Sequence, residues 1–229
     1  MIQKLFEQAQ HKYPVQEFEA EMIDGVRYYK TPSGNKYPSV TTVLSQLTKK
    51  HIAEWRERVG QEAAQRISTQ ASRRGTNVHK IAEKYMLNDS SYISKDTSPV
   101  AIDMFKQIQP IIDRDVSMVY GSEMPLYSDY LRTAGRSDLF CQFQGTNTIL
   151  DFKTASKPKK EEWIQNYFLQ CTTYAIMIEE MFNVVVPTIA VVIAVENDNP
   201  QLFVKKTKYF KDEVIRIFVN ERDGKIHLA

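Results

Sequence analysis

The sequence predicts an α/β fold in which a mixed sheet is flanked by helices and preceded by a helical region. Apolar residues recur at helical spacing within residues 51–115, and short strand patterns separated by turns follow from residue 117. Runs of strands interrupted by helices are typical of a sheet covered by helices. A chain of 229 residues with 42% hydrophobic residues is long enough to build one large domain around such a sheet.

The first part of the chain should contain a short helix, a hairpin and then longer helices. We expect a short helix and a linker within residues 1–20. Residues 25–38 hold two aromatic stretches around a Pro-Ser-Gly-Asn sequence, which predicts a β-hairpin. The segment from Ser39 should lead into a helix, and residues 51–68 are helix-forming, with Gly60 as a break.

A second long helix is expected from about Gly75 to residue 87. Its apolar face follows the i, i+3, i+4, i+7 spacing and carries Val78, Ile81, Ala82 and Tyr85. A polar loop follows this helix. Residues 99–115 should form another helix, in which Pro110 is a kink or a break.

The second half of the chain alternates strand and helix patterns. The longest apolar run, Val184–Val195, is rich in β-branched residues and contains Pro187, so we expect a buried strand there. The turn at 144–147 should join two neighbouring strands. The expected elements are strands at 117–127, 131–143 and 148–154, a helix at 161–182, strands at 187–195 and 201–207, and a helix at 210–222.

The amino-acid composition excludes only a few classes of protein. The net charge of +2, from 30 basic and 28 acidic residues, is weak evidence for a nucleic-acid partner. Cys141 and Cys171 are the only cysteines, which excludes an iron–sulfur cluster held by four thiolates of this chain. No signal-peptide pattern and no bilayer-length apolar run are present, so we expect no membrane partner, an intracellular location and reduced cysteines.

Two acidic side chains and a lysine provide the strongest chemical signal. Asp138 lies near the start of one predicted strand, and Asp151-Phe152-Lys153 ends the next. Asp151 and Lys153 are two residues apart, so they point to the same face of their strand. If the two strands pair as a hairpin, both carboxylates and the ammonium group meet at one end of one sheet face.

This arrangement suits the hydrolysis of phosphodiesters. Paired carboxylates bind hard cations such as Mg²⁺ through oxygen, and a bound cation neutralises phosphate charge and activates water. A neighbouring lysine can orient the attacking water or stabilise developing negative charge. The motif alone is weak, because a salt bridge at the end of a strand has the same sequence. A second match, Asp223-Gly224-Lys225, is expected to lie on the surface.

Other residues extend the pattern, although each also has a structural explanation. Gln170 and Tyr174 are four residues apart on one face of a predicted helix, where they could contact a phosphate or simply pack. His79 could complete a metal site or serve as a structural histidine. Glu83, one turn after His79, could orient the imidazole or form a solvated ion pair with a neighbouring lysine.

Taken together, these motifs resemble the RecB-like branch of the PD-(D/E)XK nuclease superfamily. They extend over roughly residues 35–200, and the Tyr37–Leu44 segment is similar to the mitochondrial genome maintenance exonuclease and its phage relatives. The proline of the superfamily's name is absent here. The motifs are Gly75-Thr76-x-x-His79, Glu123, Gly135-Arg136-x-Asp138, Asp151-Phe152-Lys153-Thr154 and Gln170-x-x-x-Tyr174.

The resemblance implies roles for individual residues. His79, Asp138, Asp151 and the carbonyl of Phe152 would bind one or two Mg²⁺ or Mn²⁺ ions, with help from Glu123. Lys153 would be the catalytic lysine, and Gln170 and Tyr174 would contact DNA near the scissile phosphate. Apart from these roles, further DNA contacts are expected at Arg73, Arg74, Thr76, Arg136, Thr154, Lys157, Lys159, Lys160 and Trp55. Trp55 could instead pack in the core, and the basic clusters could be ordinary solvated faces.

We therefore expect a metal-dependent DNA exonuclease acting on single strands with a free end. A structure-specific or duplex-processing endonuclease of the same fold and a nucleic-acid-binding protein with a vestigial site are the alternatives. Residues 1–116 would form the hairpin and helical region that contributes His79, and residues 117–229 the nuclease core, in one compact unit. The absence of a transit peptide favours the cytoplasm of a bacterium or of a phage-infected cell.

Overall fold

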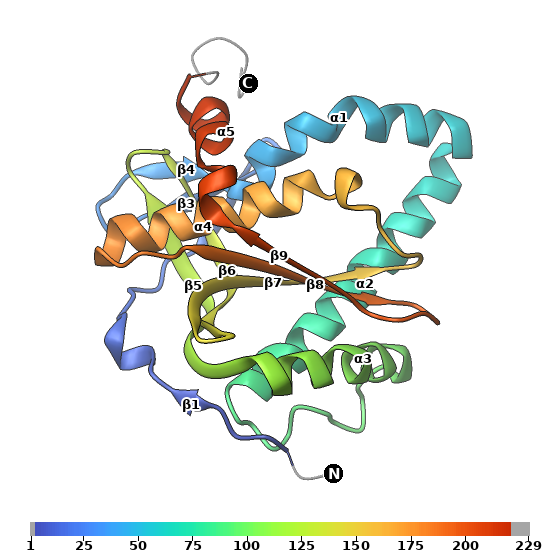
Figure 1. Ribbon diagram of the computed structural model, residues 1–229. Helices are drawn as coiled ribbons and strands as arrows, with labels where there is room; N and C mark the ends of the chain where they lie inside the picture. Colours follow the sequence, from blue (N-terminus) through green and yellow to red (C-terminus); the bar gives the residue numbers. More distant parts are fainter. Residues whose placement is uncertain (1–2, 221–229) are drawn as a thin grey trace.

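A six-stranded mixed sheet forms the centre of the computed structural model, which describes residues 3–220 (Figure 1). The order across the sheet is β1-β5-β6-β7-β8-β9. Pairs β1–β5 and β7–β8 are parallel and the other three pairs are antiparallel, which confirms the predicted mixed sheet. The strands are β1 (Glu7–Gln8), β5 (Val116–Ser128), β6 (Thr133–Phe143), β7 (Thr146–Ala155), β8 (Thr188–Val195) and β9 (Gln201–Lys206).

Helices cover both faces of this sheet (Figure 1). Helix α4 (Gln165–Phe182) packs on one face, and α2 (Gln61–Met86) and α3 (Pro99–Asp115) pack on the other. Every residue of β8 is buried, as expected from its uninterrupted apolar run. The parallel step from β7 to β8 is made through α4, which is the usual connection between parallel strands.

The hairpin of β6 and β7 forms where the sequence predicts it. The turn residues Gln144 and Gly145 both have positive φ, 49° and 74°. Such a pair forms the tight turn whose twist matches that of two antiparallel strands. The same turn sets the register that brings the acidic residues of these strands together.

The helical region begins with α1 (Val40–Val59). Ser39 caps this helix, because its hydroxyl accepts a hydrogen bond from the Thr42 amide at 3.1 Å. Gly60, at φ 84°, ends α1 and separates it from α2, as predicted. The two helices extend together beyond one end of the sheet (Figure 1).

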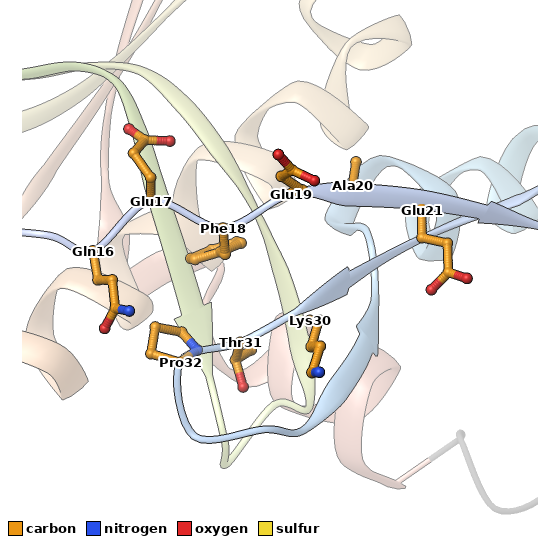
Figure 2. A pocket seen from close by; sticks show the side chains of 9 residues that line it. All are labelled: Gln16, Glu17, Phe18, Glu19, Ala20, Glu21, Lys30, Thr31 and Pro32. Atoms are coloured by element: carbon orange, nitrogen blue, oxygen red, sulfur yellow. The ribbon is translucent and has the colours of Figure 1, made fainter.

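A small antiparallel sheet lies beside the main one. It consists of β2 (Ala20–Ile23), β3 (Val26–Lys30) and β4 (Lys36–Pro38), so the predicted hairpin is confirmed and gains an extra strand. A hollow of about 620 Å³ lies between the segment 16–21 and the end of β3. Figure 2 shows the side chains that line it. In this view the Glu17 side chain points away from Thr31 and Pro32.

The expectations for residues 1–20 and for Gly75 need correction. Within the described residues 3–20, the short helix is only the 3-10 turn η1 (Gln10–Lys12), and β1 adds to the edge of β5, whose unpaired backbone groups favour an extended partner. Helix α2 begins at Gln61 and runs through Gly75, since one internal glycine costs only about 1 kcal/mol and packing outweighs it. Helix α3 is not broken at Pro110, which lies on its exposed side.

The chain continues from β9 into short helical turns. Helix α5 (Lys211–Ile215) passes into a π-helical turn at Arg216–Asn220, so the helix predicted at 210–222 is only partly regular. Residues 221–222 and the Asp223/Lys225 pair lie outside the described residues. None of the described helices is long and apolar enough to cross a membrane.

Candidate active site

Three carboxylates lie side by side on neighbouring strands. The registers of β5–β6 and β6–β7 place Glu123 level with Asp138, and Asp138 level with Asp151. The β6–β7 ladder ends just before Asp138, whose Oδ2 accepts a hydrogen bond from the Phe152 amide at 2.8 Å. The sheet thus carries a row of acidic groups where two of its strands begin to separate.

Helix α2 brings a histidine to this row. The Nδ1 atom of His79 lies 3.5 Å from Oδ2 of Asp138. One ligand atom from each of His79, Glu123 and Asp138 lies within 4.8 Å of the other two. Oxygen and nitrogen ligands bind divalent cations at about 2.0–2.6 Å, so donors separated by up to twice that length can share one ion. These residues fit a divalent metal ion.

A second group lies directly beside the first. Asp151 is 2% exposed, its Oδ2 forms an ion pair with the Lys153 ammonium, and Oδ1 accepts a hydrogen bond from Gln170 at 3.0 Å. Asp151 therefore faces Lys153 and Gln170 instead of joining the His79 cluster. Helix α4 contributes Gln170 because it packs across the same sheet face from which Asp151 and Lys153 project.

Tyr174 closes the floor of the site. It is buried on α4, and its hydroxyl lies 2.7 Å from where a Cβ on Gly135 would stand. Only glycine at position 135 allows this close approach between β6 and the tyrosine. Tyr174 is thus accommodated next to a position of β6 that has no side chain.

Most of these residues line a cleft of about 910 Å³, whereas the buried Asp151 is not part of its lining. Its walls come from the start of α1, from α2, from the small sheet, from strands β5–β7 and from α4, so they draw on most of the fold. Among the predicted residues, the cleft lining includes Thr76, His79, Glu123, Arg136, Asp138, Lys153, Gln170 and Tyr174.

The other predicted DNA contacts lie at or beyond the cleft. Arg74 donates to Glu196 at 3.0 Å and to the Thr154 hydroxyl at 3.4 Å. Arg73 is exposed on α2, and Trp55 is half-buried on α1. Lys157, Lys159 and Lys160 follow β7 in a loop, away from the cleft lining.

Comparison with known proteins agrees with this geometry. The family model of the PD-(D/E)XK nuclease superfamily matches residues 27–223. The chain belongs to this superfamily. It is also similar to the human mitochondrial genome maintenance exonuclease 1, with 27% identity over 151 residues. That match covers 61% of this chain and 43% of the human protein, so the chain spans less than half of its relative's length.

One solved structure is also similar. It is a candidate exonuclease from Eubacterium rectale, with 11% identity and a TM-score of 0.39, and the match covers 65% of this chain and 68% of the other.

Membership of the PD-(D/E)XK superfamily shows that the protein is a nuclease, and divalent metals are the cofactors of the members of this superfamily. The α/β fold predicted from the sequence is that of the superfamily.

The electrostatics of the nuclease site follow from burial and crowding. Burial, with the charges of Asp138 and Glu83, raises the pKa of Glu123 to about 7. Burial also raises the pKa of Asp151 to about 6, against the lowering effect of Lys153. Burial disfavours the Lys153 ammonium, but Asp151 and Asp138 outweigh this and hold its pKa above the ordinary value. The lysine is therefore charged at neutral pH.

Several residues of the nuclease cleft were not predicted from the sequence, among them Tyr167 and Tyr29. The Lys153 ammonium lies 5.2 Å from the centre of the Tyr167 ring, which lines the cleft from the first turn of α4. Tyr167 is three residues before Gln170, and this helical spacing could have predicted that both side chains lie on the same face of the helix. Tyr29, from the small sheet, also lines the cleft, but only the tertiary fold brings it there.

Arg136 supports the acidic row from outside. Its Nη1 donates to the Glu123 carbonyl at 2.9 Å, and its Nη2 forms an ion pair with Glu17. Glu123 has φ 48°, a left-handed conformation that is unusual for a residue within a strand. The contact with Arg136 helps to hold this conformation, which turns the Glu123 carboxylate toward His79 and Asp138.

We expect replacement of Glu123 by glutamine to raise the melting temperature of the metal-free nuclease. The ionised carboxylate is disfavoured by burial and by its acidic neighbours, so it costs stability as pH rises through about 7. The gain from Glu123→Gln should therefore be larger at pH 8 than at pH 6. Thermal unfolding in chelator at both pH values measures it, and a variant less stable than the parent at pH 8 would contradict it.

Proposed function

We propose that this nuclease is a Mg²⁺- or Mn²⁺-dependent DNA exonuclease that acts on single strands with a free end. The observation that carries the proposal is the pair of adjoining groups in one cleft. His79, Glu123 and Asp138 form a candidate cation site, and the Asp151–Lys153 pair lies next to it. The metal-dependent activity, the preference for DNA and the intracellular location remain predictions.

The residues divide the chemistry between them. A bound divalent cation would neutralise the charge of the scissile phosphate and activate the attacking water. Lys153 would orient that water and stabilise the negative charge that develops on the phosphate. Asp151 fixes the position of the lysine ammonium, and Gln170 fixes Asp151 through its hydrogen bond. Asp151 and the Phe152 carbonyl are proposed as additional cation ligands.

The shape of the cleft supports a single strand as substrate. A volume of about 910 Å³ can hold a few nucleotides of one strand. The walls come from α1, α2, α4 and both sheets. The preference for a free end rests on the similarity to the human mitochondrial genome maintenance exonuclease 1.

Linear and circular single-stranded DNA of the same sequence test the exonuclease proposal. With Mg²⁺ or Mn²⁺, we expect the linear strand to be degraded from an end and the circle to persist, since it has no end to insert. The products of end-labelled strands can be read on a sequencing gel. Equal cutting of circles would replace the exonuclease by an endonuclease of the same fold.

The dependence on metal can be tested with the same linear substrate. We expect chelation by EDTA to abolish cleavage, because the cation would neutralise the phosphate next to three carboxylates and activate the attacking water. Readdition of Mg²⁺ or Mn²⁺ should restore cleavage, and Ca²⁺ serves as a control for binding without turnover. Full activity in excess chelator would remove the metal from the mechanism.

A further inference from the structure

The segment after β7 presents an exposed tryptophan on a short turn of helix. Trp163 ends the 3-10 helix η2 (Glu161–Trp163), and 60% of its surface is exposed. The Lys160 ammonium lies 5.2 Å from the centre of its ring. Tryptophan side chains are buried in most positions, so an exposed one next to a cation on a loop is typical of a binding surface.

This segment is held in place from two sides. Gln201 on β9 accepts a hydrogen bond from the Lys159 amide at 2.7 Å and donates one to its carbonyl at 2.9 Å. Lys205, also on β9, forms an ion pair with Glu161 at 2.6 Å. A surface that is already ordered loses little conformational entropy when it binds a ligand.

The charge around the ring favours a phosphate backbone. Within residues 3–220, neither Lys157 nor Lys159 forms an ion pair with a carboxylate, whereas Glu161 is neutralised by Lys205. Lys160 and Glu162 are 3.8 Å apart and both largely exposed, so their pairing is weak. The lysines around Trp163 are therefore available to an anionic ligand.

The position of the ring connects it with the nuclease cleft. Tyr167 lies four residues after Trp163, and its ring contacts the Lys153 ammonium inside the cleft. One turn of chain thus separates the exposed indole from the group that contacts the catalytic lysine. An aromatic ring flanked by lysines combines the two features by which proteins hold a single strand, base stacking and backbone neutralisation.

We propose that Trp163 stacks on a nucleobase of the substrate strand outside the cleft, while Lys157, Lys159 and Lys160 contact its phosphates. The occupant is single-stranded nucleic acid, because a duplex keeps its bases stacked on one another and unavailable to the indole. This proposal rests on the proposed nuclease function and extends the path of the strand beyond the reacting phosphate.

Fluorescence of single-tryptophan variants tests the stacking directly, because the chain has only two tryptophans. Trp55→Phe leaves Trp163 as the reporter, and Trp163→Phe leaves Trp55. In EDTA, which prevents cleavage, we expect a short oligothymidylate to quench the fluorescence of Trp55→Phe, in which Trp163 is the only tryptophan. A blunt duplex should not quench it. Absence of quenching by the oligothymidylate, or equal quenching by the duplex, would overturn the proposal.

Binding affinity provides the second measurement. Fluorescence anisotropy of a labelled oligothymidylate should give a Kd about tenfold higher for Trp163→Ala than for the parent, as expected for the loss of one stacked base. Lys106→Ala, an exposed lysine on α3, is the matched control and should bind like the parent. Trp163→Ala should also keep the parent's melting temperature, because the ring is mostly exposed.

The outcomes separate the two proposals. A parent that degrades and binds single strands while Trp163→Ala binds them equally well would remove the stacking role and leave the nuclease function intact. A parent that neither binds the oligothymidylate nor cleaves DNA with Mg²⁺ or Mn²⁺ would overturn both. If the surface around Trp163 instead binds a protein partner, Trp163→Ala should bind single strands as well as the parent does.

Discussion

Replacing Lys153 by alanine should lower the rate of single-strand cleavage by a factor of at least about 10²–10³, the effect of removing one preorganised electrostatic group from a transition state. Lys153 is the only described lysine that is held within the acidic part of the cleft by a buried carboxylate. Its ammonium remains charged at neutral pH because Asp151 and Asp138 raise its pKa. No neighbouring group in the described cleft supplies the same charge at this point.

The measurement is the initial rate of release from an end-labelled strand at saturating metal. Lys153→Ala leaves Asp151 buried without its ion pair, so Lys153→Met, which keeps the length of the side chain, should be tested alongside it. Lys106→Ala is again the control and should keep the parental rate. If Lys153→Met folds, binds the strand and still cleaves like the parent, the assignment of the catalytic lysine is wrong.

Replacing Gly135 by alanine should destabilise the protein by about 1–3 kcal/mol, as overpacking of a filled interior does, and should strongly reduce activity. The new methyl group would lie 2.7 Å from the Tyr174 hydroxyl and 3.1 Å from the ring. Tyr174 is buried on α4, so the helix or β6 must move. Either movement displaces Gln170 or Asp138 from the site.

Tyr174→Phe provides the matching rescue. It removes the atom that lies nearest to the added methyl group, so the double variant Gly135→Ala, Tyr174→Phe should recover part of the lost stability. Urea unfolding of the parent, the two single variants and the double variant measures this coupling. If the two effects simply add, the contact between Gly135 and Tyr174 is not the cause of the destabilisation.

The local pattern of the sequence was sufficient to predict the sheet and the hairpin that carries Asp138 and Asp151. The turn at Gln144-Gly145 sets the β6–β7 register, and alternation along β7 places Asp151 and Lys153 on one face. Because such patterns act over a few residues, they can be read without the fold. The roles predicted for these residues in cleavage and DNA binding remain predictions.

Features that depend on tertiary contacts were beyond the sequence. A short helix was expected in the N-terminal segment, yet part of it pairs as β1 with the free edge of β5. Gly75 resembled a helix start, although packing of α2 keeps it inside the helix. Tyr29 enters the cleft from a separate small sheet, and Asp151 turns toward Lys153 instead of His79. Each of these outcomes depends on residues far away in the chain.

The continuity of α2 through Gly75 has a mechanical consequence. At 1.5 Å per residue, about 27 Å of helix separate Gln61 from His79, and the residues beyond His79 are anchored in the core by Ile81 and Tyr85. Because α2 is one unbroken helix, its backbone hydrogen bonds connect the junction with α1 to the turn that carries His79. We expect a displacement of that junction to change the position of the imidazole relative to Asp138.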